Sequence, residues 1–258
     1  MLDDLVAGAL ADASERRAAR SLAQVEADAV AAPAALDALA ALAPADRVKI
    51  IAEVKRASPS RGALAEIRDP AALAVSYQTG GASTISVLTE QRRFGGSLDD
   101  LRDVRAAVEV PVLRKDFIAD PYQVFEARAA GADLVLLIVA ALEQPVLTEL
   151  YRLIRDLGMT ALVEAHSAAE VERALEIGAQ LVGVNARDLT TFQLDRDLFG
   201  TLAGSIPSGV IRVAESAVTS PADVAHYREA GADVVLIGEA LVTGENPVTT
   251  LESFLAAG

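Results

Sequence analysis

A repeated unit that begins at residue 48 is the feature that most constrains how this chain can fold. Each unit is a short aliphatic or β-branched run, polar residues at its end, a helical pattern and a turn. The runs predicted to be strands are 48–54, 83–88, 110–113, 134–139, 160–163, 181–184, 210–213 and 234–237. Four of them follow similar turns: GGAS at 80, AGAD at 130, IGAQ at 177 and AGAD at 230. A glycine between a helix and a strand suits the left-handed cap that such a turn needs.

Eight strands that alternate with helices at roughly 25-residue intervals predict a (β/α)8 TIM barrel. A doubly wound sheet usually has fewer strands and a Gly-rich first turn, and no G-x-G-x-x-G follows the first run. The length of 258 residues suits one such barrel, so we expect residues 1–258 to form a single domain. Helical spacing over 2–31 and an Ala-rich segment at 29–45 predict that residues 1–46 form an N-terminal helical extension.

Composition excludes several classes of function. The net charge of −14 argues against a nucleic-acid or anionic-membrane surface, because either partner needs a basic face. The chain has no Cys, and its two histidines, His166 and His226, cannot form a His-rich metal site, so we expect no metal centre. The acidic N-terminus lacks the basic region of a signal peptide, and the apolar run 134–142 is shorter than the roughly 20 residues that span a bilayer. We therefore expect a soluble cytoplasmic protein.

Polar side chains gather at the ends of the predicted strands, where a barrel places its active site. The run 134–139 ends apolar, and the others end in charged or polar residues. These are Glu53, Lys55, Ser58 and Pro59; Thr89 and Glu90; Arg114, Lys115, Asp116 and Phe117; Glu164 and His166; Asn185, Arg187 and Asp188; Glu215 and Ser216; and Gly238 and Glu239. One such residue alone could equally be a solvated loop charge or part of a structural ion pair. Convergence of lysines and glutamates from opposed strands is the stronger signal.

This set of cations and carboxylates suits acid-base chemistry. We expect the pKa of Lys115 to be lowered by Arg114, Lys55 and Arg187, and the pKa of a desolvated glutamate to be raised. Activity should then fall at high pH as Lys115 loses its proton, and at low pH as a carboxylate gains one. Such a site favours lyase or isomerase chemistry without redox or metal.

The ends of the last two predicted strands carry a phosphate signal. Ser216 and Ala217, with Gly238 and Glu239, lie where barrels commonly bind phosphate through backbone N–H groups and the start of a short helix. A glycine after a strand is also ordinary turn chemistry, but its position after the eighth strand favours phosphate binding.

Eight motifs occur along the chain in the order known from one enzyme family. They are IAEVKRASPSRG (51–62), SVLTEQRRFGGS (86–97), PVLRKDFI (111–118), GADLVLLIVAAL (131–142), LVEAH (162–166), GVNARDL (183–189), VAES (213–216) and LIGEALV (236–242). On these motifs the chain resembles the indole-3-glycerol phosphate synthases of tryptophan biosynthesis over nearly its whole length. The resemblance implies a (β/α)8 barrel whose N-terminal extension helps to cover the site.

The same resemblance implies the reaction and its partners. The family converts 1-(2-carboxyphenylamino)-1-deoxyribulose 5-phosphate to indole-3-glycerol phosphate, with loss of carbon dioxide and water and without a cofactor. We expect a cytoplasmic monomer that acts on this phosphorylated small molecule, binds neither nucleic acid nor membrane, and can associate with other tryptophan-pathway enzymes.

Matching motif positions implies roles for individual residues. Lys115 resembles the general acid that protonates the substrate carbonyl, and Glu164 the group that handles the later proton transfer. Lys55 would pair with the anthranilate carboxylate and serve as an acid in dehydration. The remaining candidates are Glu53, Asn185 and Glu215 for catalysis; Arg187, Phe117, Leu136, Ser58, Pro59 and Leu189 for substrate binding; and Ser58, Ser216, Ala217, Gly238 and Glu239 for phosphate binding. We expect His166 to be structural and His226 to lie at the surface.

One departure and two alternatives qualify this resemblance. The family usually has Gly where this chain has Ala217, and Ala at a positive φ would strain the turn by ~1 kcal/mol or more. Another phosphate-binding barrel, such as a sugar-phosphate isomerase, would share the phosphate loops but lack the EVKRASPS and LRKDF pair. A non-catalytic barrel kept as a scaffold would have no need of Glu53, Lys55, Lys115 and Glu164 together.

Overall fold

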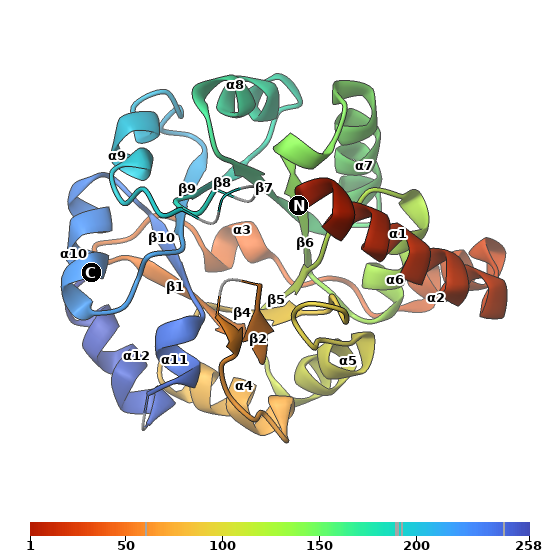
Figure 1. Ribbon diagram of the computed structural model, residues 1–258, viewed down its shortest axis with the longest axis horizontal. Helices are drawn as coiled ribbons and strands as arrows, with labels where there is room; N and C mark the ends of the chain where they lie inside the picture. The colour runs from red at the N-terminus through yellow and green to blue at the C-terminus, as the bar shows by residue number, and fades with distance from the viewer. Residues whose placement is uncertain (60, 189–190, 192, 245) are drawn as a thin grey trace.

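The eight predicted strands form one closed parallel barrel (Figure 1). The computed structural model describes residues 1–59, 61–188, 191, 193–244 and 246–258. The barrel strands are β1 (Lys49–Val54), β4 (Thr84–Leu88), β5 (Val112–Lys115), β6 (Leu134–Ile138), β7 (Thr160–Ala165), β8 (Leu181–Asn185), β9 (Ile211–Glu215) and β10 (Val234–Ile237). Their order around the barrel is β1-β10-β9-β8-β7-β6-β5-β4. The predicted (β/α)8 fold is confirmed.

Helices surround the barrel, and a buried layer of aliphatic side chains lies between them and the strands. Several of them begin with proline after an Asp, Ser or Asn, a combination that fixes the first turn and caps its free N–H groups. The helices around the barrel are α4 (Pro70–Thr79), α5 (Leu98–Ala107), α6 (Pro121–Ala129), α7 (Gln144–Asp156), α8 (Ala168–Glu176), α9 (Leu198–Ala203), α10 (Pro221–Glu229), α11 (Glu239–Val242) and α12 (Pro247–Leu255), with the 3-10 helix η1 (Val139–Ala141). No helix within the described ranges is both long and apolar enough to cross a membrane.

The repeated glycine turns adopt the predicted left-handed conformation. Gly81, Gly131, Gly178 and Gly231 have φ values of +95°, +89°, +78° and +94°. Each turn lies between a helix and the next barrel strand, so these turns return the chain to the amino end of the barrel.

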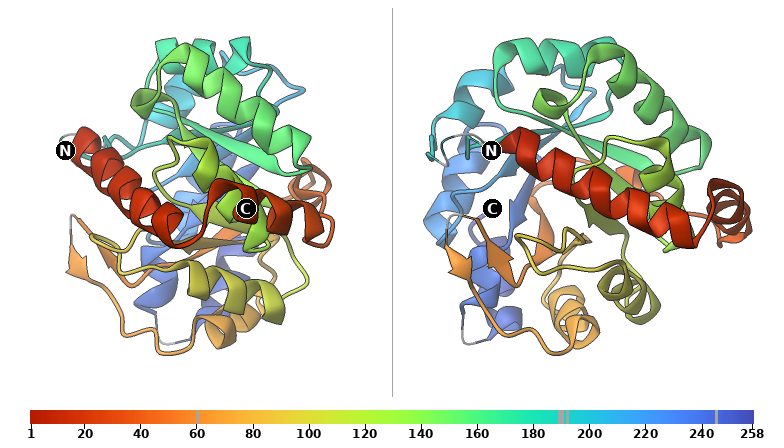
Figure 2. Two further views of the ribbon diagram at one scale, coloured as in Figure 1. Left: turned by 90° about the vertical axis from the view of Figure 1, so that its right-hand side faces the viewer. Right: turned by 45° about the vertical axis from the view of Figure 1, so that its right-hand side comes forward.

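Three helices precede the first strand: α1 (Leu2–Ala19), α2 (Leu22–Ala31) and α3 (Ala38–Ala41). Figures 1 and 2 show α1 lying across the barrel and leading to α2, which packs against α6. Leu5 of α1 and Leu42 after α3 both join the aliphatic core inside the barrel. Leu5 lies with Lys115 at the carboxyl ends of the strands, whereas the N–H of Leu36 binds Asp133 just before β6. The segment before β1 therefore covers one end of the barrel and plugs the other.

A small hairpin follows β1 in the region expected to be a loop. Its strands, β2 (Ala57–Ser58) and β3 (Gly62–Ala63), are antiparallel. Arg56 fastens this region to α5 through an ion pair with Asp100 and holds the carbonyl oxygen of Ile67 at 3.1 Å. The hairpin thus carries Ser58 and Pro59 beside the barrel mouth, the opening at the carboxyl ends of the strands.

Candidate active site

The carboxyl ends of the strands enclose a cavity of about 100 Å³ at the barrel mouth. One side of it is charged and the other is apolar. Its lining residues are Leu5, Glu53, Lys55, Ser58, Pro59, Leu88, Phe94, Lys115, Asp116, Phe117, Leu136, Ile138, Glu164, Asn185, Arg187, Ser216 and Glu239. The structure therefore brings together polar candidates predicted from six separate strand ends, with Leu136 from a seventh strand.

Lys115 lies at the centre of three carboxylates. Its Nζ is 3.8 Å from Glu53, 3.6 Å from Glu164 and 3.3 Å from Glu215. All three glutamates are buried, and the Lys115 side chain is only 15% exposed. Among the described residues no group of acidic or histidine side chains has the arrangement of a metal site.

The expectation of a lowered pKa for Lys115 is wrong. Burial alone would lower this pKa, but the three carboxylates outweigh it and raise the pKa well above its usual range. Arg114, expected to repel Lys115, points to the opposite face of β5, where its guanidinium binds Asp116 and Glu126. Lys115 thus keeps its proton at neutral pH.

The three glutamates differ in their charge. Burial alone would raise the pKa of each, but Lys55 and Lys115 lower it for Glu53, and Lys115 and His166 lower it for Glu164. For Glu215, burial and the nearby charge of Glu164 together raise the pKa to about 8. Neighbouring buried carboxylates therefore hold different protonation states, as acid-base catalysis requires.

Several buried polar atoms at the mouth lack a hydrogen-bond partner. Within the described part of the chain, Oε2 of Glu164 and both carboxylate oxygens of Glu215 accept no hydrogen bond. Such atoms are costly to bury in a protein interior, so their presence here indicates a site that a ligand completes.

Two glycines give these carboxylates room. A Cβ on Gly183 would lie 2.1 Å from Oε1 of Glu215, and one on Gly238 would lie 2.6 Å from Oε1 of Glu53. The open space above Gly238 allows Lys55 to reach Glu53, where Nζ and Oε1 are 2.7 Å apart. The glycines in β8 and after β10 thus leave the space that the side chains of Glu215 and Glu53 occupy.

The turn after β9 is bound to the end of β8. Ser216 Oγ donates to Oδ1 of Asn185 at 2.7 Å, and the same oxygen accepts the N–H of Arg187 at 3.0 Å. Ser216 and Ala217 have φ values of +69° and +59°, a left-handed conformation that favours glycine. The condition under which Ala217 strains the turn is therefore met.

A second part of the mouth, about 110 Å³ in volume, carries arginines. Arg61, Arg187 and Arg196 line it together with the predicted phosphate-binding residues Ser216, Ala217, Gly238 and Glu239. Glu239 forms an ion pair with Arg61 at 3.1 Å. Arg196 is also paired, with Asp223 at 2.8 Å, so this part of the mouth gathers cations in an otherwise acidic chain while carboxylates balance two of them.

The apolar side of the mouth faces the charged groups. Phe117 lies there beside Phe94, with their ring centroids 6.2 Å apart, and Leu136 and Ile138 come from the end of β6. This surface could contact a flat aromatic group, while Ser58 and Pro59 of the hairpin close one edge. Leu189, predicted to bind substrate, lies outside the described residues.

The two histidines occupy different settings. The side chain of His166 is 11% exposed and contacts both Glu164 and Glu170. His226 is exposed on α10 beside Tyr227, as expected of a surface residue.

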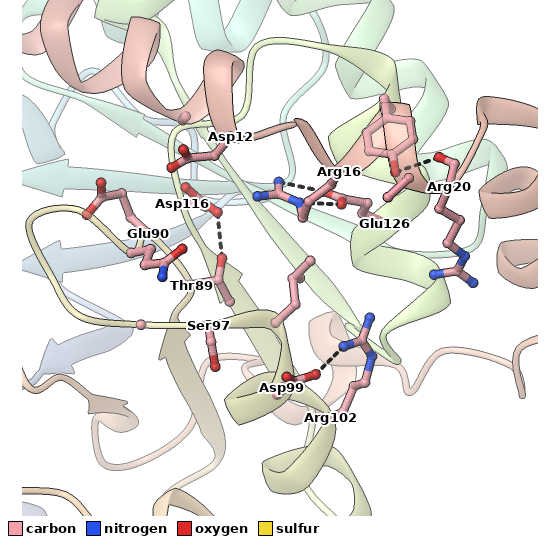
Figure 3. A pocket seen from close by; sticks show the side chains of 16 residues that line it. Asp12, Arg16, Arg20, Thr89, Glu90, Ser97, Asp99, Arg102, Asp116 and Glu126 are labelled. Atoms are coloured by element: carbon pink, nitrogen blue, oxygen red, sulfur yellow. Dashed lines mark hydrogen bonds and ion pairs between the residues drawn. The ribbon is translucent and has the colours of Figure 1, made fainter. Parts of the chain in front are cut away.

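A larger cavity of about 430 Å³ lies between α1 and α5 (Figure 3). Among its lining residues, Arg16 binds Glu126 (Nε to Oε1, 2.6 Å) and Thr89 donates to Asp116 at 2.6 Å. Thr89, Asp116 and Glu126 also bond to the buried Arg114 of β5. Asp99 and Arg102 at its rim also pair with each other. These charges are neutralised within the protein, so the larger cavity is a weaker candidate for a binding site than the mouth.

Sequence reasoning did not single out several residues of the mouth. Arg61 and Phe94 lie inside two of the quoted motifs and could have been found there. Leu5 and Arg196 gave no signal, because they are distant from the other site residues in the sequence and only the fold brings them to the mouth. Glu170, which contacts His166 from α8, gave no signal either.

Comparisons with known proteins agree with these observations. The sequence profile of the family described as "Indole-3-glycerol phosphate synthase" matches residues 2–254. A protein of that name from Leifsonia xyli subsp. xyli is 73% identical over 254 residues, covering 98% of this chain and 97% of the relative. The protein of that name from Beutenbergia cavernae is 58% identical over 258 residues, covering 100% and 96%.

Solved structures with low sequence identity support the fold alone. A 3-hexulose-6-phosphate synthase superposes with a TM-score of 0.64 at 18% identity, over 81% of this chain and 99% of that one. A thiamine phosphate pyrophosphorylase from Pyrococcus furiosus gives 0.62 at 14% identity, over 81% and 95%. From its full-length sequence match and its close relatives, the chain belongs to the indole-3-glycerol phosphate synthase family.

Proposed function

We propose that this protein converts 1-(2-carboxyphenylamino)-1-deoxyribulose 5-phosphate to indole-3-glycerol phosphate, with loss of carbon dioxide and water. The observation that carries the proposal is the position of Lys115, whose Nζ lies within 3.8 Å of three buried carboxylates, beside an opening that three arginines line. Family membership supplies the reaction, and the mouth has groups suited to each of its steps without a cofactor.

Lys115 is the general acid in ring closure. When the aromatic carbon attacks the ketone carbon, the ketone oxygen becomes a hydroxyl and must gain a proton. The raised pKa of Lys115 keeps that proton available at neutral pH, and the neighbouring carboxylates hold the ammonium group in place. Loss of carbon dioxide then restores the aromatic ring.

Glu164 is the base for the later proton transfer. Its lowered pKa keeps it ionised, and its Oε2 has no hydrogen-bond partner among the described residues. As water leaves, this oxygen can accept the proton whose removal completes the indole. Lys55 pairs with the substrate carboxylate and gives a proton to the departing hydroxyl, while Glu53 holds its ammonium group at 2.7 Å.

The remaining candidates bind and orient the substrate. Asn185 and Glu215 orient the substrate from the two parts of the mouth, and Phe117 and Leu136 flank its aromatic ring with Pro59. The phosphate lies in the arginine-lined part of the mouth, near Arg187, Ser58, Ser216, Ala217, Gly238 and Glu239. A role for Leu189 remains a prediction from the family motif.

Further proposals concern the setting of the enzyme. We propose a cytoplasmic protein that acts as a monomer and can associate with other tryptophan-pathway enzymes. We also propose that residues 1–258 form a single domain in which residues 1–46 are the N-terminal extension. Light scattering of the purified protein at micromolar concentration tests the monomer, since a dimer would double the mass.

A turnover assay with the purified protein tests the function. The expected result is release of carbon dioxide together with formation of the indole product. Lys115→Ala and Glu164→Gln should each lose at least roughly 10²–10⁴-fold in kcat while their melting curves stay near wild type. Arg102→Ala, which removes a cation from the larger cavity, serves as the control and should retain activity.

Other outcomes would point elsewhere. A variant of Lys115 or Glu164 within a few-fold of wild type would make Lys55 or Glu53 the next candidate. Turnover of a sugar phosphate without release of carbon dioxide would favour an isomerase, and no turnover of any such substrate would favour a scaffold.

A further inference from the structure

His166 lies between the proposed base and a second carboxylate. Its Nδ1 is hydrogen-bonded to Oε2 of Glu170 at 3.2 Å, whereas its Nε2 lies 3.4 Å from Oε1 of Glu164, within ion-pair distance but without a hydrogen bond among the described residues. Glu164 belongs to β7 and Glu170 to the first turn of α8, so the imidazole bridges the strand and the helix that follows it. The ring is largely buried, which restricts it to this arrangement.

Glu170 is held in place by its own bonds. Its Oε2 accepts the backbone N–H of His166 at 2.8 Å, and its Oε1 accepts the hydroxyl of Ser167 at 3.1 Å. Ser167 also caps α8 by accepting the N–H of Glu170. The second carboxylate is therefore a rigid anchor at the start of the helix.

The charges on this chain of groups support one another. Burial alone would lower the pKa of His166, but the carboxylates of Glu164 and Glu170 raise it to about 10. Burial alone would raise the pKa of Glu170, but its bonds to His166 lower it. Glu164 and Glu170 are the charged groups that face the ring, and Lys115 and Asn185 face Glu164 from β5 and β8. The two carboxylates thus favour the imidazolium form of the ring.

We propose that His166 and Glu170 are positioning residues, in which Glu170 fixes the His166 ring and the ring fixes Oε1 of Glu164. This inference rests on the proposed role of Glu164 as the base. With Oε1 held on one side, Oε2 is the oxygen that turns toward Lys115, 3.6 Å away, and it is the oxygen without a hydrogen-bond partner among the described residues. The arrangement directs one defined oxygen at the substrate.

Substituting glutamine or asparagine for His166 tests the two contacts of the imidazole one at a time. The amide of glutamine reaches about as far as Nε2, toward Glu164, whereas the shorter asparagine reaches only the position of Nδ1, toward Glu170. His166→Asn should therefore lower kcat by about tenfold or more, the size of effect seen when residues that orient functional groups are removed. His166→Gln should recover much of this loss, and KM should change less than kcat in both variants.

Glu170→Gln tests the anchor without shortening any side chain. It should lower kcat by several-fold because the ring loses one of its two carboxylates. Glu172→Gln is the matched control, because it makes the same change on an exposed position of the same helix. Equal kcat for the asparagine, glutamine and wild-type enzymes, or equal effects of the Glu170 and Glu172 variants, would overturn the proposal.

Imidazole NMR gives a readout that does not depend on turnover. The chain has only two histidines, so a His226→Gln variant assigns the signal of His166. That signal should stay in the protonated form through pH 8 in wild type and should titrate at lower pH in Glu170→Gln. A His166 ring that is neutral at pH 7 in wild type would contradict the bridge between carboxylates.

Different results would overturn the proposed reaction and the positioning role of His166. If wild type does not convert the carboxyphenylamino substrate, the proposed function is wrong whatever the NMR signal shows. If wild type is active and the NMR signal behaves as expected, but His166→Asn keeps wild-type kcat, the contact exists without a role in positioning the base.

Discussion

Arg114 and Lys115 are neighbours on β5, yet they lie in opposite kinds of surroundings. Arg114 points outward and is fully buried, with its nitrogens bonded to Thr89, the carbonyl oxygen of Gln123, Asp116 and Glu126. Lys115 points into the mouth, where carboxylate oxygens of its neighbours lack hydrogen-bond partners within the described residues. Both clusters are charged and buried, so burial and charge alone do not distinguish a structural cluster from a catalytic one.

The difference between the two clusters lies in how many of their buried polar atoms form hydrogen bonds. The larger cavity, about 430 Å³, is lined in part by Thr89 and Glu126, which bond to Arg114. The smaller mouth of about 100 Å³ is lined in part by Lys115 and Glu164, whose Oε2 has no hydrogen-bond partner among the described residues. Unpaired buried groups are unfavourable in a folded protein and are retained where a substrate or a reaction uses them. In this barrel the incomplete bonding, and not the size of the cavity, indicates the active site.

Gly183→Ala should produce a large loss on the mouth side, because it displaces the carboxylate of Glu215 without replacing that residue. The added Cβ would meet Oε1 of Glu215 at 2.1 Å, so that carboxylate must move out of the cluster. Displacement of about 1 Å can cost roughly 10²-fold in rate, so kcat should fall by about that factor. Gly209→Ala, where the new Cβ meets nothing within 4 Å, should leave kcat unchanged. Equal activity of the two variants would show that Glu215 need not lie where it does.

Truncation separates the two ends of the barrel. Deleting residues 1–20 removes Leu5 from the mouth and Arg16 from the outer cluster, so KM should rise by about tenfold while unfolding stays cooperative. Deleting residues 1–43 also removes the buried Leu42 from the inner core and should cost about 2–5 kcal/mol more in the free energy of unfolding. Chemical denaturation of both proteins measures this contrast, and equal stability would show that α3 does not plug the barrel.

The pKa of Glu215 predicts how stability depends on pH. Its folded-state pKa is raised to about 8, whereas an unfolded glutamate titrates near about 4.3. The unfolded state therefore ionises first, and stability falls as pH rises from about 4.5 toward 8. Glu215→Gln removes this term and should gain on the order of 1–3 kcal/mol over wild type at pH 8 but little at pH 4.5. A difference that did not change between these pH values would contradict the raised pKa.

Ala217→Gly should produce the smallest change. Glycine removes the Cβ beside the predicted phosphate-binding residues and suits the φ of +59°, so KM should fall by a few-fold with little change in kcat. Relief of about 1–2 kcal/mol of strain is largely offset by the ~0.4–1 kcal/mol that glycine costs through the unfolded chain. Stability should therefore change little. An unchanged KM in steady-state kinetics would show that this turn does not limit phosphate binding.

The barrel and most of the mouth could be predicted from the sequence because both follow from local patterns. Alternating runs and glycine turns predicted the strands, and strand ends predicted Glu53, Lys115 and Glu164 as neighbours. The pKa of Lys115 could not be predicted. Two adjacent residues on a strand point to opposite faces, and the sequence does not say whether Arg114 or Lys115 faces inward. The hairpin after β1 was missed because its strands are only two residues each. The contact of His166 with Glu170 depends on how α8 begins, which no periodicity records.

Exchanging the two cations of β5 for Met, one at a time, tests the comparison most directly. Lys115→Met should lose at least roughly 10²-fold in kcat and keep its melting temperature within a few degrees, because Lys55 and His166 still pair with Glu53 and Glu164. Arg114→Met leaves Asp116 and Glu126 buried without this partner and should lose about 3–5 kcal/mol of stability, or fail to fold, with kcat per folded molecule within about tenfold of wild type. Kinetics and denaturation of both variants give the result. An active Lys115→Met enzyme, or an Arg114→Met enzyme that is stable but inactive, would contradict the division of β5 into a structural and a catalytic face.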